Sequence, residues 1–388
     1  MKQIIKNANI VIDEDILYRH SLLISDGKIS EISPDINLFS NNSNFQVIDA
    51  NNQYLSAGFI DLHIHGIENY LIDDGTESLS KICKILPKYG VTGFLATVCP
   101  LPKGKDSDFL KSLSSNTYAG TPILGFHLEG PFLTLTGALS PEALGNADIN
   151  RVEKLIKAAK PYKTIFSISP DFENIMDLMP IMTQNDCPVF ITHTKANVQQ
   201  SLNAIKAGAC HATHFYDVFY APDMTEPGVR PCGAVEAILA SPDVIVDFIL
   251  DGIHCDPIVI KMALVCKGKD RVCLITDANI GAGLGAGRYR FGGEEVEIAH
   301  AGAPARLVTN GGLAGSGLTM NLAVKNAVNM LGVDLPLAVK MASDNPAKVL
   351  RLKNKGLIKQ GYDADLVIFD KEFNVLKTFI NGKCCFEK

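Results

Sequence analysis

The chain has 388 residues, of which 47% are hydrophobic and 20% are charged, and its 36 Lys and Arg against 42 Asp and Glu give a net charge of −6. This composition is typical of a folded globular protein and excludes a largely disordered one. No dense run of Lys or Arg is present, and no apolar run approaches the ~20 residues that span a bilayer, so we expect neither a nucleic-acid nor a membrane partner. Without an export signal, and with ten cysteines that form no CxxC pair, the chain is predicted to be cytoplasmic with reduced thiols.

Short β-like runs with turns make up residues 1–56, and Asp26-Gly27 is typical of a hairpin turn between two of them. Residues 355–388 show the same pattern of short apolar runs separated by Gly turns. We therefore expect the two ends of the chain to fold together into one small β-sandwich domain.

Between these ends, strand-like apolar runs alternate with segments whose apolar residues have helical spacing, such as 149–159. The eight predicted strands are 58–65, 91–98, 122–129, 163–169, 187–193, 209–214, 244–250 and 271–277. Eight β–α units predict an α/β fold, a (β/α)8 TIM barrel over residues 57–354, with a doubly wound open sheet as the alternative.

An irregular stretch at about 281–312 follows the eighth predicted strand and contains its own β-like pieces, so we expect a β insertion there. The Gly-rich segment 311–317 is predicted to be a loop leading into a helix over 319–331. Neither it nor the Gly-rich segment 281–287 joins a first strand to a helix, as a dinucleotide-binding motif must.

Side chains of metal-ligating types follow the ends of several predicted strands. His63 and His65 are one residue apart, so in a strand they point to the same face. Glu129, His193 and His214 end or follow later strands, and Asp277 ends the eighth. A closed barrel gathers these strand ends around one mouth, which predicts a shared metal site.

Nitrogen and carboxylate ligands suit Zn²⁺ or Fe²⁺ better than Ca²⁺ or Mg²⁺. Such an ion activates water for hydrolysis, and Asp277 is placed to take that proton and pass it to a leaving amine. A Gly-x-Ser-x-Gly elbow for a serine nucleophile is absent around Ser316, and Lys163 lies at the wrong end of its strand for a carboxylated-lysine bridge. The pattern therefore predicts a metal-dependent hydrolase.

Several motifs resemble those of the amidohydrolase superfamily and, within it, the N-acetylglucosamine-6-phosphate deacetylase family. They are GFIDLHIHG (58–66), HLEGPF (127–132), EPG (226–228), DGIH (251–254), TDA (276–278), LAGS (313–316) and GYDADLV (361–367). The resemblance covers nearly the whole chain. It implies hydrolysis of the N-acetyl amide of a small amino sugar phosphate, by default N-acetylglucosamine 6-phosphate, by a homodimer.

The same resemblance implies roles for individual residues. Glu129, His193 and His214 correspond to the ligands of the principal metal, and Asp277 to the general base and acid. His63 and His65 match members in which an HxH pair holds a second ion, so one or two ions per chain are expected. His254 corresponds to a substrate-binding histidine, and Leu313, Ala314 and Gly315 to a loop that lines the substrate.

Three positions that recognise sugar in the family depart from its pattern. Ala138 and Leu139 stand in a loop that commonly ends in a substrate-binding His, and Asp217-Val218 stand where Asn-Ala is usual. Thr225 replaces the Arg that binds phosphate, in some relatives across the subunit interface, and Arg230 is the nearest substitute. These departures leave open an amidohydrolase of diverged specificity, and a non-catalytic barrel scaffold is a weaker alternative.

Overall fold

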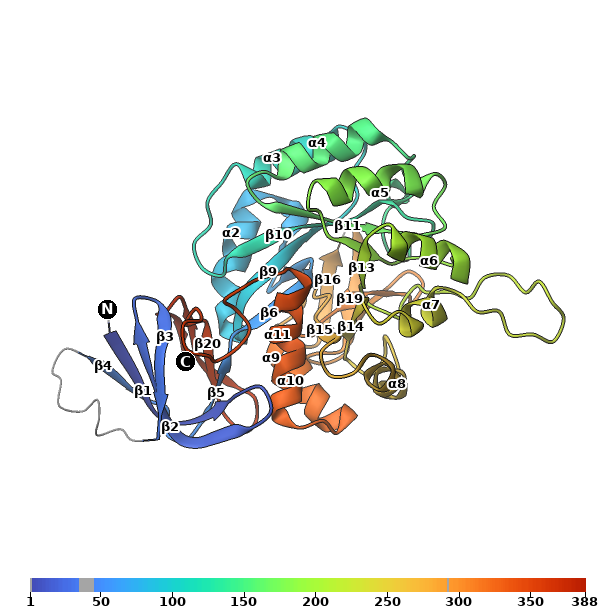
Figure 1. Ribbon diagram of the computed structural model, residues 1–388. Coiled ribbons are helices and arrows are strands. Elements are labelled where there is room, and N and C mark those ends of the chain that lie inside the picture. The colour runs from blue at the N-terminus through green and yellow to red at the C-terminus, as the bar shows by residue number, and fades with distance from the viewer. Residues whose placement is uncertain (1, 35–44, 292) are drawn as a thin grey trace.

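A computed structural model describes residues 2–34, 45–291 and 293–388, which form a barrel with a small β domain beside it (Figure 1). The barrel sheet has eight parallel strands in the order β15-β14-β13-β12-β11-β10-β9-β6. They are β6 (Phe59–Ile64), β9 (Val91–Val98), β10 (Ile123–Phe132), β11 (Lys163–Ile168), β12 (Val189–Ile191), β13 (Ala209–Ala212), β14 (Ile245–Ile249) and β15 (Val272–Ile275). Each lies within a predicted strand or extends it by a few residues, so the barrel prediction is confirmed and the open sheet was wrong.

Closure of the barrel joins the first and last of these strands, which are more than 200 residues apart in sequence. The Asp277 N–H donates to the His63 carbonyl at 2.9 Å, and the His65 N–H donates to the Ala278 carbonyl at 2.9 Å. Beneath them, Asp61 accepts a 2.6 Å hydrogen bond from the Thr276 hydroxyl. Closure therefore fixes His63, His65 and Asp277 against one another.

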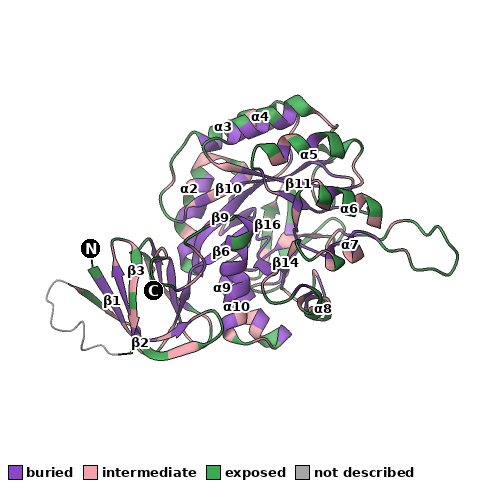
Figure 2. Cartoon of the chain, in the orientation of Figure 1, coloured by how far each residue is buried: buried purple, intermediate pink, exposed green. Residues whose placement is uncertain are grey.

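Helices follow the strands and cover the outside of the barrel, with buried strands inside and exposed outer helix faces (Figure 2). In α4, Val152, Leu155, Ile156 and Ala159 are buried at helical spacing, and the Asp148 side chain caps the first turn. The helices are α2 (Thr76–Ile85), α3 (Lys105–Ser114), α4 (Ile149–Ala159), α5 (Ile175–Gln184), α6 (Val198–Lys206), α7 (Ala234–Ala240), α8 (Pro257–Lys267), α9 (Met320–Asn326), α10 (Leu335–Ala342) and α11 (Asp344–Val349). A π-helical turn, Ala327–Leu331, continues α9, in agreement with the helix predicted at 319–331.

Both ends of the chain contribute to one mixed sheet, seen at the lower left of Figure 1. Its strands are β1 (Lys2–Val11), β2 (Ile16–Ser25), β3 (Lys28–Ser33), β4 (Gln46–Asp49), β5 (Tyr54–Ala57), β20 (Leu366–Phe369), β21 (Val375–Ile380) and β22 (Lys383–Glu387). Strand β1 pairs with β4 along its first half and with β5 near its end, so the sheet divides there around a separate apolar core. The predicted hairpin turn at Asp26-Gly27 joins β2 to β3, and both turn residues have positive φ.

The expected insertion forms a small antiparallel sheet of four strands: β16 (Gly287–Phe291), β17 (Glu294–Ile298), β18 (Pro304–Leu307) and β19 (Leu313–Ser316). The prediction of a loop at 311–317 was wrong in part, because 313–316 pair with β18 as a strand. β18 and β19 are consecutive antiparallel strands, and their pairing supplies hydrogen bonds that the Gly-rich sequence by itself does not suggest.

All ten cysteines have free thiols in the structure. Among the described residues, no helix is both long enough and apolar enough to cross a bilayer.

Candidate functional site

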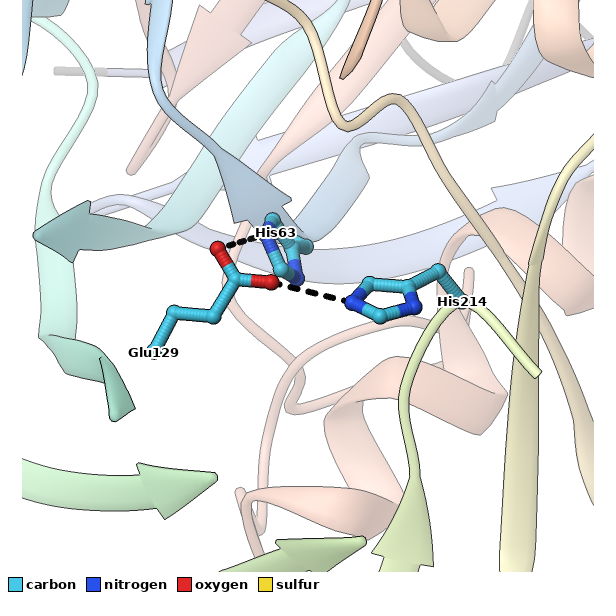
Figure 3. Close-up of side chains that lie close together, drawn as sticks. All are labelled: His63, Glu129 and His214. Carbon is cyan, nitrogen blue, oxygen red and sulfur yellow. Dashed lines mark hydrogen bonds and ion pairs between the residues drawn. The ribbon is translucent and has the colours of Figure 1, made fainter. Parts of the chain in front are cut away.

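The Glu129 carboxylate, on β10, lies at the centre of four histidine rings. One oxygen, Oε1, is 3.0 Å from His214 Nε2 and 3.3 Å from His193 Nε2. The other, Oε2, is 3.2 Å from His65 Nε2 and 3.6 Å from His63 Nε2. Figure 3 shows the carboxylate between the rings of His63 and His214. The structure therefore brings together all five residues that the sequence predicts as metal ligands.

Asp277 lies beside this group, two residues after β15. Its Oδ1 is 3.4 Å from His65 Nε2 and 3.5 Å from His63 Nε2. One ligand atom each from His63, His65 and Asp277 lies within 4.8 Å of the others, and the same holds for His63, Glu129 and His214. Two overlapping ligand groups thus share His63.

Three of these residues have a left-handed backbone conformation immediately after a strand. The φ angles are 47° at His193, 34° at His214 and 44° at Asp277. Such a conformation is unfavourable for a side chain with a Cβ and persists only where surrounding structure imposes it. Here it turns each side chain out of the barrel wall and toward the mouth.

The second ring nitrogen of three histidines is held by a neighbour. His63 Nδ1 is 3.2 Å from the Thr213 hydroxyl, His193 Nδ1 is 3.1 Å from the Leu135 carbonyl, and His65 Nδ1 is 3.5 Å from Cys99 Sγ. A His whose Nδ1–H donates to a fixed acceptor presents the lone pair of Nε2. These outer contacts orient the Nε2 atoms toward Glu129.

Charges in the group shift the pKa values of its members. Burial alone would lower the pKa of His65 and of His214, but the hydrogen bond and charge of Glu129 outweigh burial and raise them to about 9 and about 10. Burial alone would raise the pKa of Glu129, yet the histidines around it hold that pKa well below its usual range. The site therefore keeps an ionised carboxylate that attracts positive charge.

This donor set fits a divalent transition metal. Four imidazole nitrogens and two carboxylates converge in a buried site, the ligand types that bind Zn²⁺ or Fe²⁺. Glu129, His193 and His214 would hold one ion, and His63, His65 and Asp277 are placed to hold a second.

A cavity of about 370 Å³ opens over these ligands. Six residues that the sequence analysis assigns to substrate line it: Ala138, Asp217, Val218, Leu313, Ala314 and Gly315. Gly315 has φ +67°, and a Cβ there would lie 2.7 Å from the Asp277 carbonyl oxygen, so a larger residue would displace the strand from Asp277. Leu139, one of the departures from the family pattern, also lines the cavity.

His254 is not among the residues that line this cavity. Its Nδ1 is 2.7 Å from Asp251 Oδ2, and its buried Nε2 has no hydrogen-bond partner among the described residues. Burial alone would lower the pKa of His254, but the bond and charge of Asp251, with the charges of Asp217 and Asp277, raise it. His254 Nε2 is therefore a buried ring nitrogen that is free to bind a ligand.

Arg230 is not brought to the cavity of its own chain. It belongs to the segment between β13 and α7, part of which extends away from the barrel (Figure 1). Its side chain is 76% exposed and pairs with Glu236 at 2.7 Å. None of the described residues that line the cavity is Lys or Arg.

Sequence reasoning missed part of the cavity wall. Phe291 and Leu307 come from the inserted sheet, and Asn310 and Tyr220 come from loops. The Phe291 ring lies 6.0 Å from the His65 ring, centre to centre. The sequence predicts β pieces in the insertion, but no local signal indicates that they fold back over the barrel mouth.

Comparison with known proteins finds amidohydrolases and sugar-phosphate deacetylases that match nearly the whole chain. The model of the amidohydrolase family matches residues 54–385. An N-acetylglucosamine-6-phosphate deacetylase of Bacillus subtilis is 30% identical over 99% of this chain and 97% of its own length. An N-acetylgalactosamine-6-phosphate deacetylase of Escherichia coli O157:H7 is also 30% identical, over 99% of both chains.

Solved structures of two deacetylases superimpose on nearly the whole chain. The N-acetylglucosamine-6-phosphate deacetylase of Pasteurella multocida superimposes with a TM-score of 0.87 at 28% identity, covering 99% of both chains. A mutant of the Mycobacterium smegmatis deacetylase, in complex with N-acetyl-D-glucosamine-6-phosphate, gives a TM-score of 0.88 at 25% identity, with 99% of both chains covered.

Proposed function

Because the chain belongs to the amidohydrolase family, we propose that it hydrolyses the N-acetyl amide of an amino sugar phosphate, by default N-acetylglucosamine 6-phosphate, to the free amine and acetate. The observation that carries this proposal is the Glu129 carboxylate shared by two histidine pairs, with Asp277 beside them at the floor of a cavity. A non-catalytic scaffold would have no need of this complete set.

We propose Zn²⁺ or Fe²⁺ as the cofactor, with one or two ions per chain. When bound, such an ion lowers the pKa of a bound water and polarises a carbonyl. Asp277 accepts the proton of the attacking water and delivers it to the amide nitrogen as the bond to carbon breaks. Leu313, Ala314 and Gly315 hold the sugar over the ligands, and the Phe291 and Leu307 side chains limit the entry of bulk water.

Similarity to known proteins supports two candidate sugars. Relatives named for N-acetylglucosamine 6-phosphate and for N-acetylgalactosamine 6-phosphate are equally similar, at 30% identity. Because of Asp217 and Leu139, a more diverged N-acyl sugar is an alternative substrate. Asp217 brings a carboxylate to the cavity, and Leu139 offers no hydrogen bond.

We propose a homodimer in which the partner's copy of the extended segment supplies the missing cation. That segment exposes Met224 and Val229, and the nearby helix α8 exposes Ile258 and Val265. Exposed apolar side chains on a projecting segment are typical of an interface. In such a dimer Arg230 can serve the second copy's site, since it does not serve its own.

We also propose that residues 1–56 with 355–388 and residues 57–354 are the two domains of the chain. The free thiols favour a reducing compartment, and we propose the cytoplasm.

The direct test is acetate release. The purified chain, loaded with Zn²⁺ or with Fe²⁺, is assayed on both sugar phosphates and on unphosphorylated N-acetylglucosamine, with Asp277→Asn as the control. Release from one phosphorylated sugar that depends on Asp277 is the expected result. No release from either one, with turnover of another N-acyl compound, would instead establish the diverged amidohydrolase.

A further inference from the structure

A third group of ligand atoms lies on the opposite side of the His65 ring from Glu129. His65 Nε2 faces Glu129 and Asp277, whereas His65 Nδ1 is 3.5 Å from Cys99 Sγ. The Cys99 N–H donates to Asp73 Oδ1 at 3.1 Å, and the Cys99 thiol also hydrogen-bonds the Asp73 carboxylate. One nitrogen, one oxygen and one sulfur from these three residues lie within 4.8 Å of one another.

Neighbouring barrel elements hold the three residues in place. His65 follows β6 and Cys99 follows β9, two strands that pair in parallel. Asp73 lies in a 3-10 turn, Ile72–Asp74, which is anchored by a 2.8 Å hydrogen bond from the Ile72 N–H to the His65 carbonyl. The group is therefore built on rigid elements, as a specific ligand site requires.

Solvent can reach this group from its own side. Asp73 and Cys99 line a second cavity, of about 930 Å³, and Cys99 is partly exposed. Leu139, Phe291 and Leu307 line both this cavity and the one over Glu129, so the two cavities adjoin. An ion can approach Cys99 without passing through the substrate cavity.

We propose that His65, Asp73 and Cys99 form a separate site for a zinc-like divalent ion, and that filling this site inhibits the enzyme. A thiolate, an imidazole and a carboxylate are the ligand types of zinc, and the remaining position stays open to water. Binding forms the metal–sulfur bond and releases the thiol proton to solvent.

The His65 ring explains the inhibition, because a neutral imidazole has a lone pair on only one of its two nitrogens. If His65 Nδ1 binds the outer ion, the ring proton resides on Nε2. That nitrogen then donates a hydrogen bond to Glu129 or Asp277 and offers no lone pair to an ion in the catalytic cavity. The outer site and the second catalytic position thus compete for His65, while His193 and His214 are unaffected.

Cobalt binding tests the site without any substrate. Co²⁺ is titrated into the metal-free full chain carrying Cys384→Ser and Cys385→Ser, which removes two adjacent exposed thiols. None of the described residues that line the catalytic cavity is a cysteine. Cys232 and Cys266 remain exposed, so the thiolate-to-cobalt absorption band is assigned to the outer site only by its dependence on Cys99. We expect the band to disappear in Cys99→Ser and to require at least about tenfold more Co²⁺ in Asp73→Asn.

Cys210→Ser is the matched control, because Cys210 is also partly exposed but lies on β13 at the opposite end of the barrel. It should leave the band unchanged. An absent band in the parent protein, or an equal band in Cys99→Ser, overturns the proposed site.

Inhibition is measured separately and rests on the proposed function. Each variant's deacetylation in excess Zn²⁺ is compared with its own rate at low Zn²⁺. We expect the half-inhibitory Zn²⁺ concentration to rise at least about tenfold in Cys99→Ser and not in Cys210→Ser. Equal inhibition of both variants overturns the inhibitory role. Since the cobalt spectra need no activity, failure of the proposed function and failure of this site are distinguishable.

Discussion

His211 Nε2 lies 2.6 Å from Asp247 Oδ2, and both side chains are fully buried within the barrel beneath the proposed metal site. The other oxygen of Asp247, Oδ1, accepts a 2.5 Å hydrogen bond from the His214 N–H, and the Asp247 carbonyl accepts one from the Phe215 N–H at 2.9 Å. Asp247 thereby stabilises the left-handed turn that presents His214 to Glu129.

Replacing Asp247 by Ala should destabilise the protein and weaken metal binding together. The change leaves buried His211 Nε2 and the His214 N–H without their hydrogen-bond partner, and each buried polar group left unsatisfied costs about 1–3 kcal/mol. Urea unfolding of the metal-free protein measures this loss, with the exposed Asp243→Ala as the control. An unchanged free energy of unfolding would show that the pair contributes nothing to stability.

Glu129→Gln should abolish metal binding and activity. The amide keeps the shape of the side chain but loses the charge that four imidazoles share. A bound metal supplies several kcal/mol of transition-state stabilisation, so we expect activity to fall at least about 100-fold. Elemental analysis and acetate release measure both effects, and Glu153→Gln, exposed on α4, is the control. Full metal content in Glu129→Gln would contradict the assigned ligand set.

Asp277→Asn should lower kcat while the principal metal remains bound. Asp277 is the proposed proton carrier, and loss of general acid–base catalysis costs about 100- to 10,000-fold. Glu129, His193 and His214 are unchanged, so we expect at least one ion per chain by elemental analysis. Asp177→Asn, exposed on α5, should behave as wild type. A variant that keeps most of its kcat would assign the proton transfer to another group.

Metal affinity should rise with pH. In the metal-free site the pKa of His65 is raised to about 9 and that of His214 to about 10, so bound protons compete with the ion at neutral pH. Competition against a chelator at about pH 6, 7.5 and 9 measures this effect. An affinity independent of pH would contradict it.

The stability of the metal-free protein should fall as pH rises. Both pKa values are raised above the ordinary value of 6.5, so the stabilisation from protonated His65 and His214 is fully present below about pH 6.5 and is lost as pH rises toward 9 to 10. We expect the Tm of the metal-free protein to fall over that range and the increase in Tm on adding Zn²⁺ to grow. A metal-free Tm that rises with pH would argue against this charge arrangement.

Arg230→Gln should weaken the use of phosphorylated sugars selectively. If Arg230 binds phosphate in the partner's site, loss of a charge-assisted pair costs about 1.5–3 kcal/mol, or about 10- to 150-fold in kcat/KM. Turnover of an unphosphorylated analogue should be unchanged. Arg351→Gln is a matched control, since Arg351 is also 76% exposed and paired, with Asp186. Equal losses on both substrates would exclude a phosphate contact.

Much of the fold was predictable because its signals are local. Apolar runs of strand length, separated by helical periodicity, indicated all eight barrel strands, and β9 and β15 are buried throughout as such runs require. The proposed metal ligands were recognisable for the same reason: each stands at or just after the end of a strand. The strand at 313–316 was missed because its hydrogen bonds come from β18 and not from its own Gly-rich sequence.

The sequence by itself determined which residues can bind a metal and at which end of the strands they lie, since strand periodicity and side-chain chemistry are properties of neighbouring residues. Only the tertiary structure decided that Glu129 divides its two oxygens between two histidine pairs, that Phe291 closes one wall of the cavity, that Cys99 and Asp73 meet His65, and that Arg230 lies away from its own site. Those relationships arise when the closed barrel and its inserted sheet bring together segments more than 200 residues apart, such as His65 and Phe291, which are 226 residues apart. Contacts at such separation have no counterpart in the local pattern of the chain.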